Sequence, residues 1–68
     1  MDMRKLVGRN VRAARQARGM TQEQLAETSG FSQQYISDLE RGRRNPTIVS
    51  LYELAQALKS TPVELLRP

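Results

Sequence analysis

Amide and guanidinium side chains supply most of the usable chemistry in this sequence. Gln33 and Gln34 follow Ser32, a favourable helix N-cap, so both belong to the first turn of a helix. A glutamine amide can pair with adenine N6 and N7 through two hydrogen bonds. Arg43 and Arg44 follow, and a guanidinium is suited to binding phosphate. These residue types are suited to a polar, anionic partner.

The charge of the chain is unevenly distributed. The 68 residues hold 11 Lys and Arg against 7 Asp and Glu, a formal charge of +4. Residues 1–20 carry six basic side chains against one acid, Asp2, whereas residues 21–68 carry five against six. A concentration of positive charge favours a polyanion partner, either nucleic acid or an anionic membrane surface. The alternative is a helix face that is simply solvated.

Composition excludes several classes of function. The chain has neither Cys nor His, so it lacks a thiolate metal site, a disulfide framework and the commonest general base. We therefore expect no enzyme, no metal, no cofactor and no small-molecule ligand. No apolar run of about 18 residues is present, and the N-terminus lacks the apolar core of a signal peptide. We expect a single cytoplasmic domain, residues 1–68, that does not engage a membrane.

Helix start signals recur along the chain and predict an all-α fold of five short helices. Asp2, Thr21, Ser32, Thr47 and Thr61 each occupy an N-cap position before a helical pattern. Helical spacing predicts two buried stripes, one in the first helix (Met3, Leu6, Val7, Val11, Ala14, Ala17) and one in the fourth (Ile48, Leu51, Leu54, Ala55, Leu58). The last two residues, 67 and 68, are expected to fray.

The second and third helices have the spacing of a helix-turn-helix over about residues 22–41. Ala26 is small enough for a close helix crossing, and Gly30 permits a sharp turn. Ile36 and Leu39 then anchor a helix, about residues 33–41, that is otherwise polar.

With these positions and several others, the chain resembles the phage-repressor and Cro-like (XRE-type) helix-turn-helix regulators. The resemblance covers roughly residues 5–66 and rests on Arg15, Thr21-Gln22, Leu25-Ala26, Gly30, Ser32, Ile36-Ser37, Leu39-Glu40, Gly42, Pro46 and the Leu51, Leu54-Ala55, Leu58 helix. It implies a lambda-repressor-like domain whose third helix reads the major groove of double-stranded DNA, and hence a transcriptional regulator.

The resemblance also implies which residues contact DNA. Gln33, Gln34, Ser37 and Asp38 become the candidates for base contacts, with Asp38 either accepting from cytosine N4 or orienting an arginine, Arg41. The candidates for phosphate contacts are Thr21, Gln22, Ser32, Arg41, Arg43 and Arg44. In the family, the glutamine that matches Gln22 also braces the first glutamine of the reading helix. The alternative roles are a plain cap for Thr21 and a solvated loop for the arginines.

Two further expectations concern assembly and function. By resemblance, Arg15 and Glu40 form an ion pair between the first and third helices. A homodimer on a two-fold operator, with half-sites about 10 bp apart, would use Val63, Leu65 and Leu66, unless these residues only complete the core. The alternative function is a protein-interaction module, such as an antitoxin, in which DNA binding is secondary. Binding to a membrane surface through the first helix is a weaker alternative, because that helix has no aromatic residue.

Overall fold

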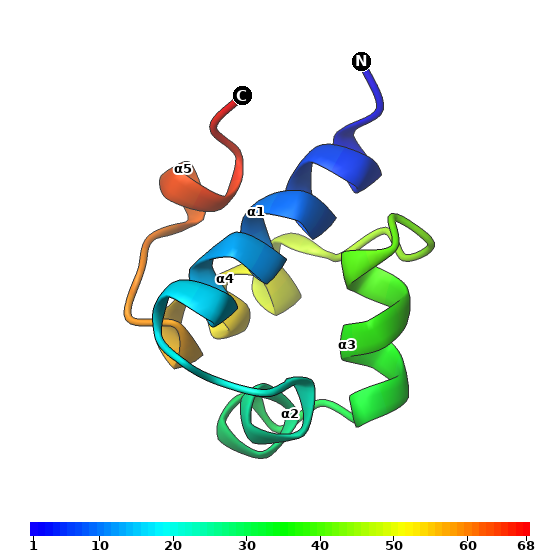
Figure 1. Cartoon of the computed structure of the whole chain (residues 1–68). Coiled ribbons are helices and arrows are strands. Elements are labelled where there is room, and N and C mark those ends of the chain that lie inside the picture. The colour runs from blue at the N-terminus through cyan, green and yellow to red at the C-terminus, as the bar shows by residue number, and fades with distance from the viewer.

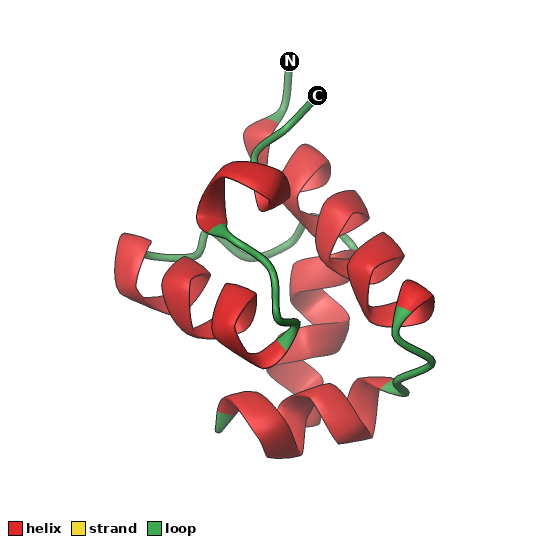
Figure 2. Ribbon diagram, turned by 90° about the vertical axis from the view of Figure 1, so that its left-hand side faces the viewer, coloured by secondary structure: helices red, strands yellow, loops and turns green.

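The structure is a computed structural model that describes residues 1–68 as five helices with no strand. The helices are α1 (Met3–Ala17), α2 (Gln22–Ser29), α3 (Gln33–Glu40), α4 (Ile48–Ala57) and α5 (Pro62–Leu65). α3 packs against α1 and α2, and α5 packs against α1 and α4 (Figures 1 and 2). The all-α prediction with five short helices is confirmed. None of these helices combines the length and the apolarity needed to cross a bilayer.

Every helix begins at its expected N-cap. The side chains of Asp2, Thr21, Ser32, Thr47 and Thr61 each accept a hydrogen bond from a backbone N–H two or three residues ahead. At α2 the cap is reciprocal, because the Gln24 side chain also accepts from the Thr21 backbone N–H at 2.9 Å. These local hydrogen bonds satisfy N–H groups that have no partner within the helix.

The Asp2 cap affects the ionisation of its carboxyl group. Slight desolvation raises the pKa of Asp2, while the N–H groups of Arg4 and Lys5 and the charge of Arg4 lower it. The net result is a pKa below the ordinary 3.8, so the helix cap favours the charged carboxylate.

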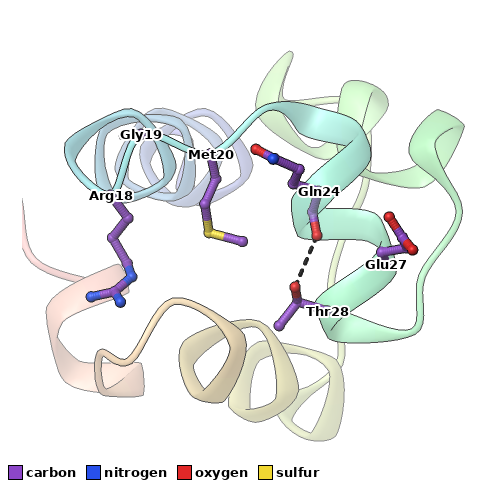
Figure 3. Close-up of a pocket in the computed structure, with 6 residues that line it drawn as sticks. All are labelled: Arg18, Gly19, Met20, Gln24, Glu27 and Thr28. Carbon is purple, nitrogen blue, oxygen red and sulfur yellow. Dashed lines mark hydrogen bonds between the residues drawn. The ribbon is translucent and has the colours of Figure 1, made fainter.

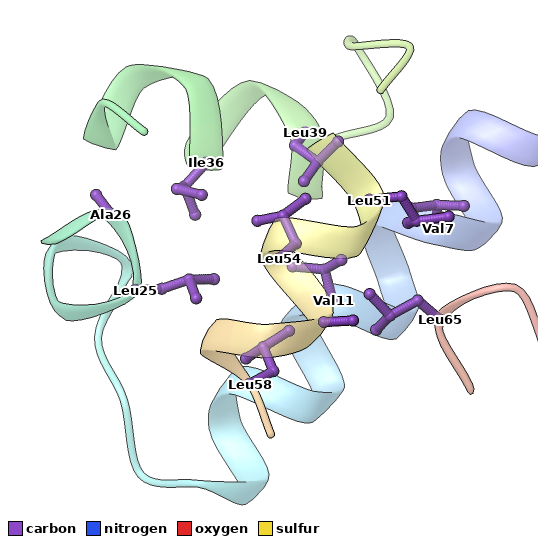
Figure 4. Packing of buried hydrophobic residues seen from close by; sticks show 11 residues of the cluster. Val7, Val11, Leu25, Ala26, Ile36, Leu39, Leu51, Leu54, Leu58 and Leu65 are labelled. Atoms are coloured by element: carbon purple, nitrogen blue, oxygen red, sulfur yellow. The ribbon is translucent and has the colours of Figure 1, made fainter. Parts of the chain in front are cut away.

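A single apolar core joins all five helices (Figure 4). Its fully enclosed side chains are Val11, Leu25, Ile36, Leu39, Leu54 and Leu65. Three residues of the predicted stripes lie outside it: Met3 and Ala17 at the two ends of α1 are exposed, and Ile48 is 87% exposed. Ile48 is the first residue of α4, so its side chain projects before the helix reaches the core.

Gly8 sets how closely α1 approaches the C-terminal end of α3. A Cβ at this position would overlap the carbonyl oxygen of Leu39 and would lie 3.0 Å from that of Glu40. Only a residue without a side chain permits this crossing. α1 is therefore the support against which α3 is oriented.

The turn between α2 and α3 consists of Gly30, Phe31 and Ser32. Gly30 ends α2 in the left-handed conformation (φ +83°) and donates its N–H to the Ala26 carbonyl at 2.9 Å. Ser32 then caps α3 at once. The short connection lets Ala26, Ile36 and Leu39 share the core while the rest of α3 stays outside.

The C-terminal residues are held against α1, contrary to the expected fraying. The Asn10 amide donates to the carbonyl oxygens of Leu65, at 2.9 Å, and Arg67, at 2.7 Å. Leu65 itself is only 1% exposed and lies in the core. It therefore has no surface to offer a second subunit, which corrects its assignment to a dimer interface.

Candidate nucleic-acid interface

The outer face of α3 presents polar side chains on a rigid base. Ile36 and Leu39 are fully buried, which fixes the inward edge of the helix. Gln33 and Gln34 are exposed in the first turn, directly after the Ser32 cap. Ser37 and Asp38 are half-buried one turn further along, so the four candidate base-contacting residues lie on one short helix.

Asp38 makes a contact that sequence reasoning did not foresee. Its Oδ1 accepts a hydrogen bond from Gln34 Nε2 at 3.0 Å. Asp38 and Arg41 form no ion pair, so the alternative in which Asp38 orients Arg41 is not observed. The carboxylate instead fixes the amide of Gln34, and its second oxygen is left to accept another donor.

Beneath α3, Arg15 and Glu40 form a nearly buried ion pair. Arg15 Nε lies 2.6 Å from Glu40 Oε2 and Nη2 lies 3.0 Å from Oε1, and their side chains are 11% and 4% exposed. Arg15 Nη1 also donates to the Met20 carbonyl oxygen at 2.8 Å. The two-pronged geometry joins α1, the loop before α2 and the end of α3 in one network.

Gln22 is part of the same network. Its Nε2 donates to Glu40 Oε1 at 3.1 Å, and no hydrogen bond links it to Gln33. The brace that the family resemblance implied is therefore absent here. A carboxylate is a stronger acceptor than a neutral amide, so Glu40 holds the Gln22 side chain.

The hydroxyl oxygens of Thr21 and Ser32 are engaged in helix capping. Thr21 Oγ1 accepts from the Gln24 N–H at 3.1 Å, and Ser32 Oγ accepts from the Tyr35 N–H at 3.0 Å. Each hydroxyl keeps its hydrogen as a donor, so a cap and a phosphate contact are compatible.

The arginine loop after α3 is anchored to that helix. The Arg43 N–H donates to the Asp38 carbonyl oxygen at 2.9 Å. The Arg44 guanidinium lies 4.7 Å from the centre of the Tyr35 ring, and this ring stacks on Phe31 at 4.6 Å. Tyr35 therefore positions Arg44 close to the first turn of α3. This role of Tyr35 was not predicted from the sequence, although its spacing from Phe31 (i, i+4) was an available signal.

The hollow with the largest volume, 580 Å³, does not include α3 (Figure 3). It is lined by the loop after α1 and by residues of α2. It is open, and Arg18 and Glu27 are its charged side chains. Thr28 donates to the Gln24 carbonyl oxygen at 3.0 Å, and the Gln24 side chain belongs to the α2 cap. The Thr28 hydroxyl and the Gln24 amide thus serve the local structure of α2.

A second feature of the surface is apolar. Met3, Ile48 and Leu66 are exposed around a hollow of 220 Å³ whose floor includes Val7 and Leu51. Val49 and Val63 are also exposed, by 65% and 66%. We call the group Met3, Ile48, Val49, Val63 and Leu66 the apolar surface.

Comparison with known proteins places this geometry among regulators. A family model described as helix-turn-helix matches residues 11–65. An HTH-type transcriptional regulator of Sinorhizobium fredii, y4dJ, is 63% identical over 68 residues, which are all of this chain and 88% of that protein.

Solved structures show the same arrangement. The hypothetical transcription factor NHTF from Neisseria is 34% identical, with a TM-score of 0.94 over 98% of this chain and 77% of that one. The restriction-modification controller protein C.Esp1396I, solved as a tetramer with its natural 35 base-pair operator, is 33% identical, with a TM-score of 0.85 over 98% of this chain and 99% of that one. None of these three proteins is described as an antitoxin, so that alternative gains no support.

Proposed function

Because the chain belongs to the helix-turn-helix family of transcriptional regulators, we propose that it binds double-stranded DNA sequence-specifically and regulates transcription from the site it occupies. The observation that carries the proposal is the outer face of α3, where Gln33 and Gln34 are exposed on a helix held rigidly by the core and by the Arg15–Glu40 pair. Such a regulator acts where the DNA is, in the cytoplasm, and carries out no catalytic step.

In this proposal, α3 enters the major groove with its first turn leading. Gln33 and Gln34 pair with base edges, and adenine is the partner that suits an amide best. Ser37 and the free oxygen of Asp38 contribute one turn further along, where cytosine N4 is a matching donor.

Phosphate contacts flank the reading helix on both sides. On one side, the free N–H groups at the start of α2 and the Thr21 and Gln22 side chains approach one strand. On the other side, Ser32 and the loop residues Arg43 and Arg44 approach the second strand, with Arg44 held over Tyr35. These contacts set the register of α3, whereas the base contacts supply the sequence preference.

We further propose that the active form is a homodimer on a two-fold site with half-sites about 10 bp apart. One short reading helix makes few base contacts, so a second copy is needed to obtain high specificity. The apolar surface is the candidate interface: Ile48, Val49, Val63 and Leu66 replace the buried Leu65 in this role.

Selection from a random duplex pool tests the function. The wild type is expected to enrich one sequence with two-fold symmetry. An Arg43→Ala variant should weaken binding to every sequence alike and flatten the dependence of log K on log salt by about 1.8 for the homodimer, which is about 0.9 for one phosphate contact in each half-site. A wild type that enriches nothing would contradict the proposal.

Sedimentation equilibrium tests the dimer. Ile48→Glu places a charge on the apolar surface without touching the core, because Ile48 is 87% exposed. This variant should remain folded and become monomeric, and it should bind a single half-site more tightly relative to the full site than the wild type does. An unchanged oligomeric state would exclude this surface as the interface.

A further inference from the structure

A small polar cleft lies between α1, the start of α2 and the end of α3. Its volume is 230 Å³. The five residues that line it are Arg12, Arg15, Gln22, Glu40 and Arg41. No apolar side chain contributes to its walls. A water-accessible cleft lined by guanidinium, amide and carboxylate groups is chemically suited to an anion.

The charges in the cleft are not balanced. Three guanidinium groups face one carboxylate, and that carboxylate is already occupied by Arg15 at 2.6 Å and by the Gln22 amide at 3.1 Å. Arg12 and Arg41 are exposed and have no acidic partner within ion-pair distance. The buried Arg15–Glu40 pair is thus electrically neutral and forms the floor of the cleft. The unpaired guanidinium groups of Arg12 and Arg41 lie at its rim.

The two free cations come from different helices. Arg12 belongs to α1, whereas Arg41 is the C-cap residue of α3. Their side chains reach the same cleft from separate elements, so they can donate to different oxygens of one anion. The cleft also borders Gln22, the first residue of α2, where backbone N–H groups are free of helical partners.

We infer that this cleft holds one backbone phosphate of the bound DNA, and that Arg12 is a phosphate-binding residue. The inference rests on the proposed function and extends it to Arg12, which is not among the expected phosphate contacts. A phosphodiester carries a single negative charge and two free oxygens, which matches two guanidinium donors at the rim. Because the floor joins α1 to α3, a phosphate held here fixes α3 relative to the DNA strand.

Arg9 provides the matched control. It is an exposed arginine on the same helix, but it lines a different hollow beside the chain termini. A general effect of net charge would make Arg9 and Arg12 equivalent, whereas a specific phosphate contact distinguishes them.

The experiment compares wild type, Arg12→Gln, Arg12→Lys and Arg9→Gln on the duplex that the wild type selects, by fluorescence anisotropy from 50 to 200 mM salt. Arg12→Gln should flatten the slope of log K against log salt by about 1.8 for the homodimer, which is about 0.9 for one phosphate contact in each half-site. The affinity advantage of the wild type over this variant should therefore shrink about 12-fold across that fourfold change in salt. Arg12→Lys should keep the slope, since it keeps the charge, and Arg9→Gln should keep it too.

A second arm locates the phosphate. Neutral methylphosphonates replace the operator phosphates one position at a time. One position in each half-site should weaken binding by the wild type more than binding by Arg12→Gln, because the variant keeps only Arg41 at that phosphate. The base preference of Arg12→Gln and its thermal midpoint should equal those of the wild type, because Arg12 is exposed and unpaired.

The outcomes separate this inference from the proposed function. A wild type that binds no duplex overturns both. A wild type that binds its site normally, while Arg12→Gln keeps the full salt slope or loses no more than Arg9→Gln, overturns only the phosphate cleft. The phosphate cleft is overturned as well if no methylphosphonate position has a smaller effect on Arg12→Gln than on the wild type.

Discussion

Removing Arg15 should be among the most damaging single substitutions in this domain. Arg15→Met leaves the Glu40 carboxylate, 4% exposed, with the Gln22 amide as its remaining side-chain partner. Breaking one side of a buried ion pair costs about 3–5 kcal/mol, because a charge stays buried without compensation. A domain of this size has a total stability of only about 3–10 kcal/mol, so a large part of it would be lost.

Urea titration followed by circular dichroism measures this effect. With an m-value near 1 kcal/mol/M for a small domain, the unfolding midpoint should fall by about 3 M or more. Arg15→Lys keeps the charge but loses the bidentate geometry and the hydrogen bond to Met20. Its unfolding midpoint should therefore lie between those of the wild type and Arg15→Met. This intermediate variant keeps the test usable if Arg15→Met does not fold.

A double variant separates pairing from packing. Arg15→Met combined with Glu40→Leu removes both charges, and replacing a buried pair by apolar groups is often close to neutral. The double variant should therefore be more stable than Arg15→Met alone. A loss below about 1 kcal/mol in Arg15→Met, the value for an exposed ion pair, would show that this pair does not act as a buried one.

Three more predictions concern the crossing of α1 with α3, the Tyr35 ring on α3 and the N-cap of α1. Gly8→Ala should lower the free energy of unfolding by about 1–2 kcal/mol in a urea titration, since overlap with α3 outweighs the helix propensity of Ala; a stabilised variant would contradict the close crossing. Tyr35→Leu should weaken operator binding about 2–5-fold by anisotropy, which corresponds to the loss of a cation–π contact of about 0.5–1 kcal/mol, and this loss should vanish when Arg44 is already Ala. The pKa of Asp2 is lowered on folding, so its stabilising effect is fully present above the unfolded value of 3.8 and is lost as the pH falls through the folded value. Urea titrations at pH values from above 3.8 downward should show that the free energy of unfolding decreases more steeply with falling pH in the wild type than in Asp2→Asn.

Local signals in the sequence predicted the fold well. Each N-cap depends on a hydrogen bond within one turn, so Thr21 and Ser32 could be identified without any tertiary information. The same holds for Gly30, whose position between two helical patterns requires a left-handed turn. The exposure of Gln33 and Gln34 followed from their distance from the apolar edge of the helix.

Apart from the Arg15–Glu40 pair, which the family resemblance implied, several features that depend on tertiary packing could not be predicted. Helical spacing included Ile48 in the core, but its place at the very start of α4 leaves it exposed. Gly8 carried no signal of its own, because its role arises only where α1 meets the α3 carbonyl groups. Gln22 was expected near Gln33, yet the meeting of the α2 start with the α3 end gives it Glu40 instead.

We propose above all that the first turn of α3 reads base pairs. The most direct test repeats the pool selection with Gln33→Ala and Gln34→Ala, at fixed salt. Each variant should lose preference at one or two adjacent base pairs of each half-site, at a cost of about 1–3 kcal/mol there, and should keep the rest of the wild-type sequence. Variants that select the same sequence as the wild type at every position would contradict the account.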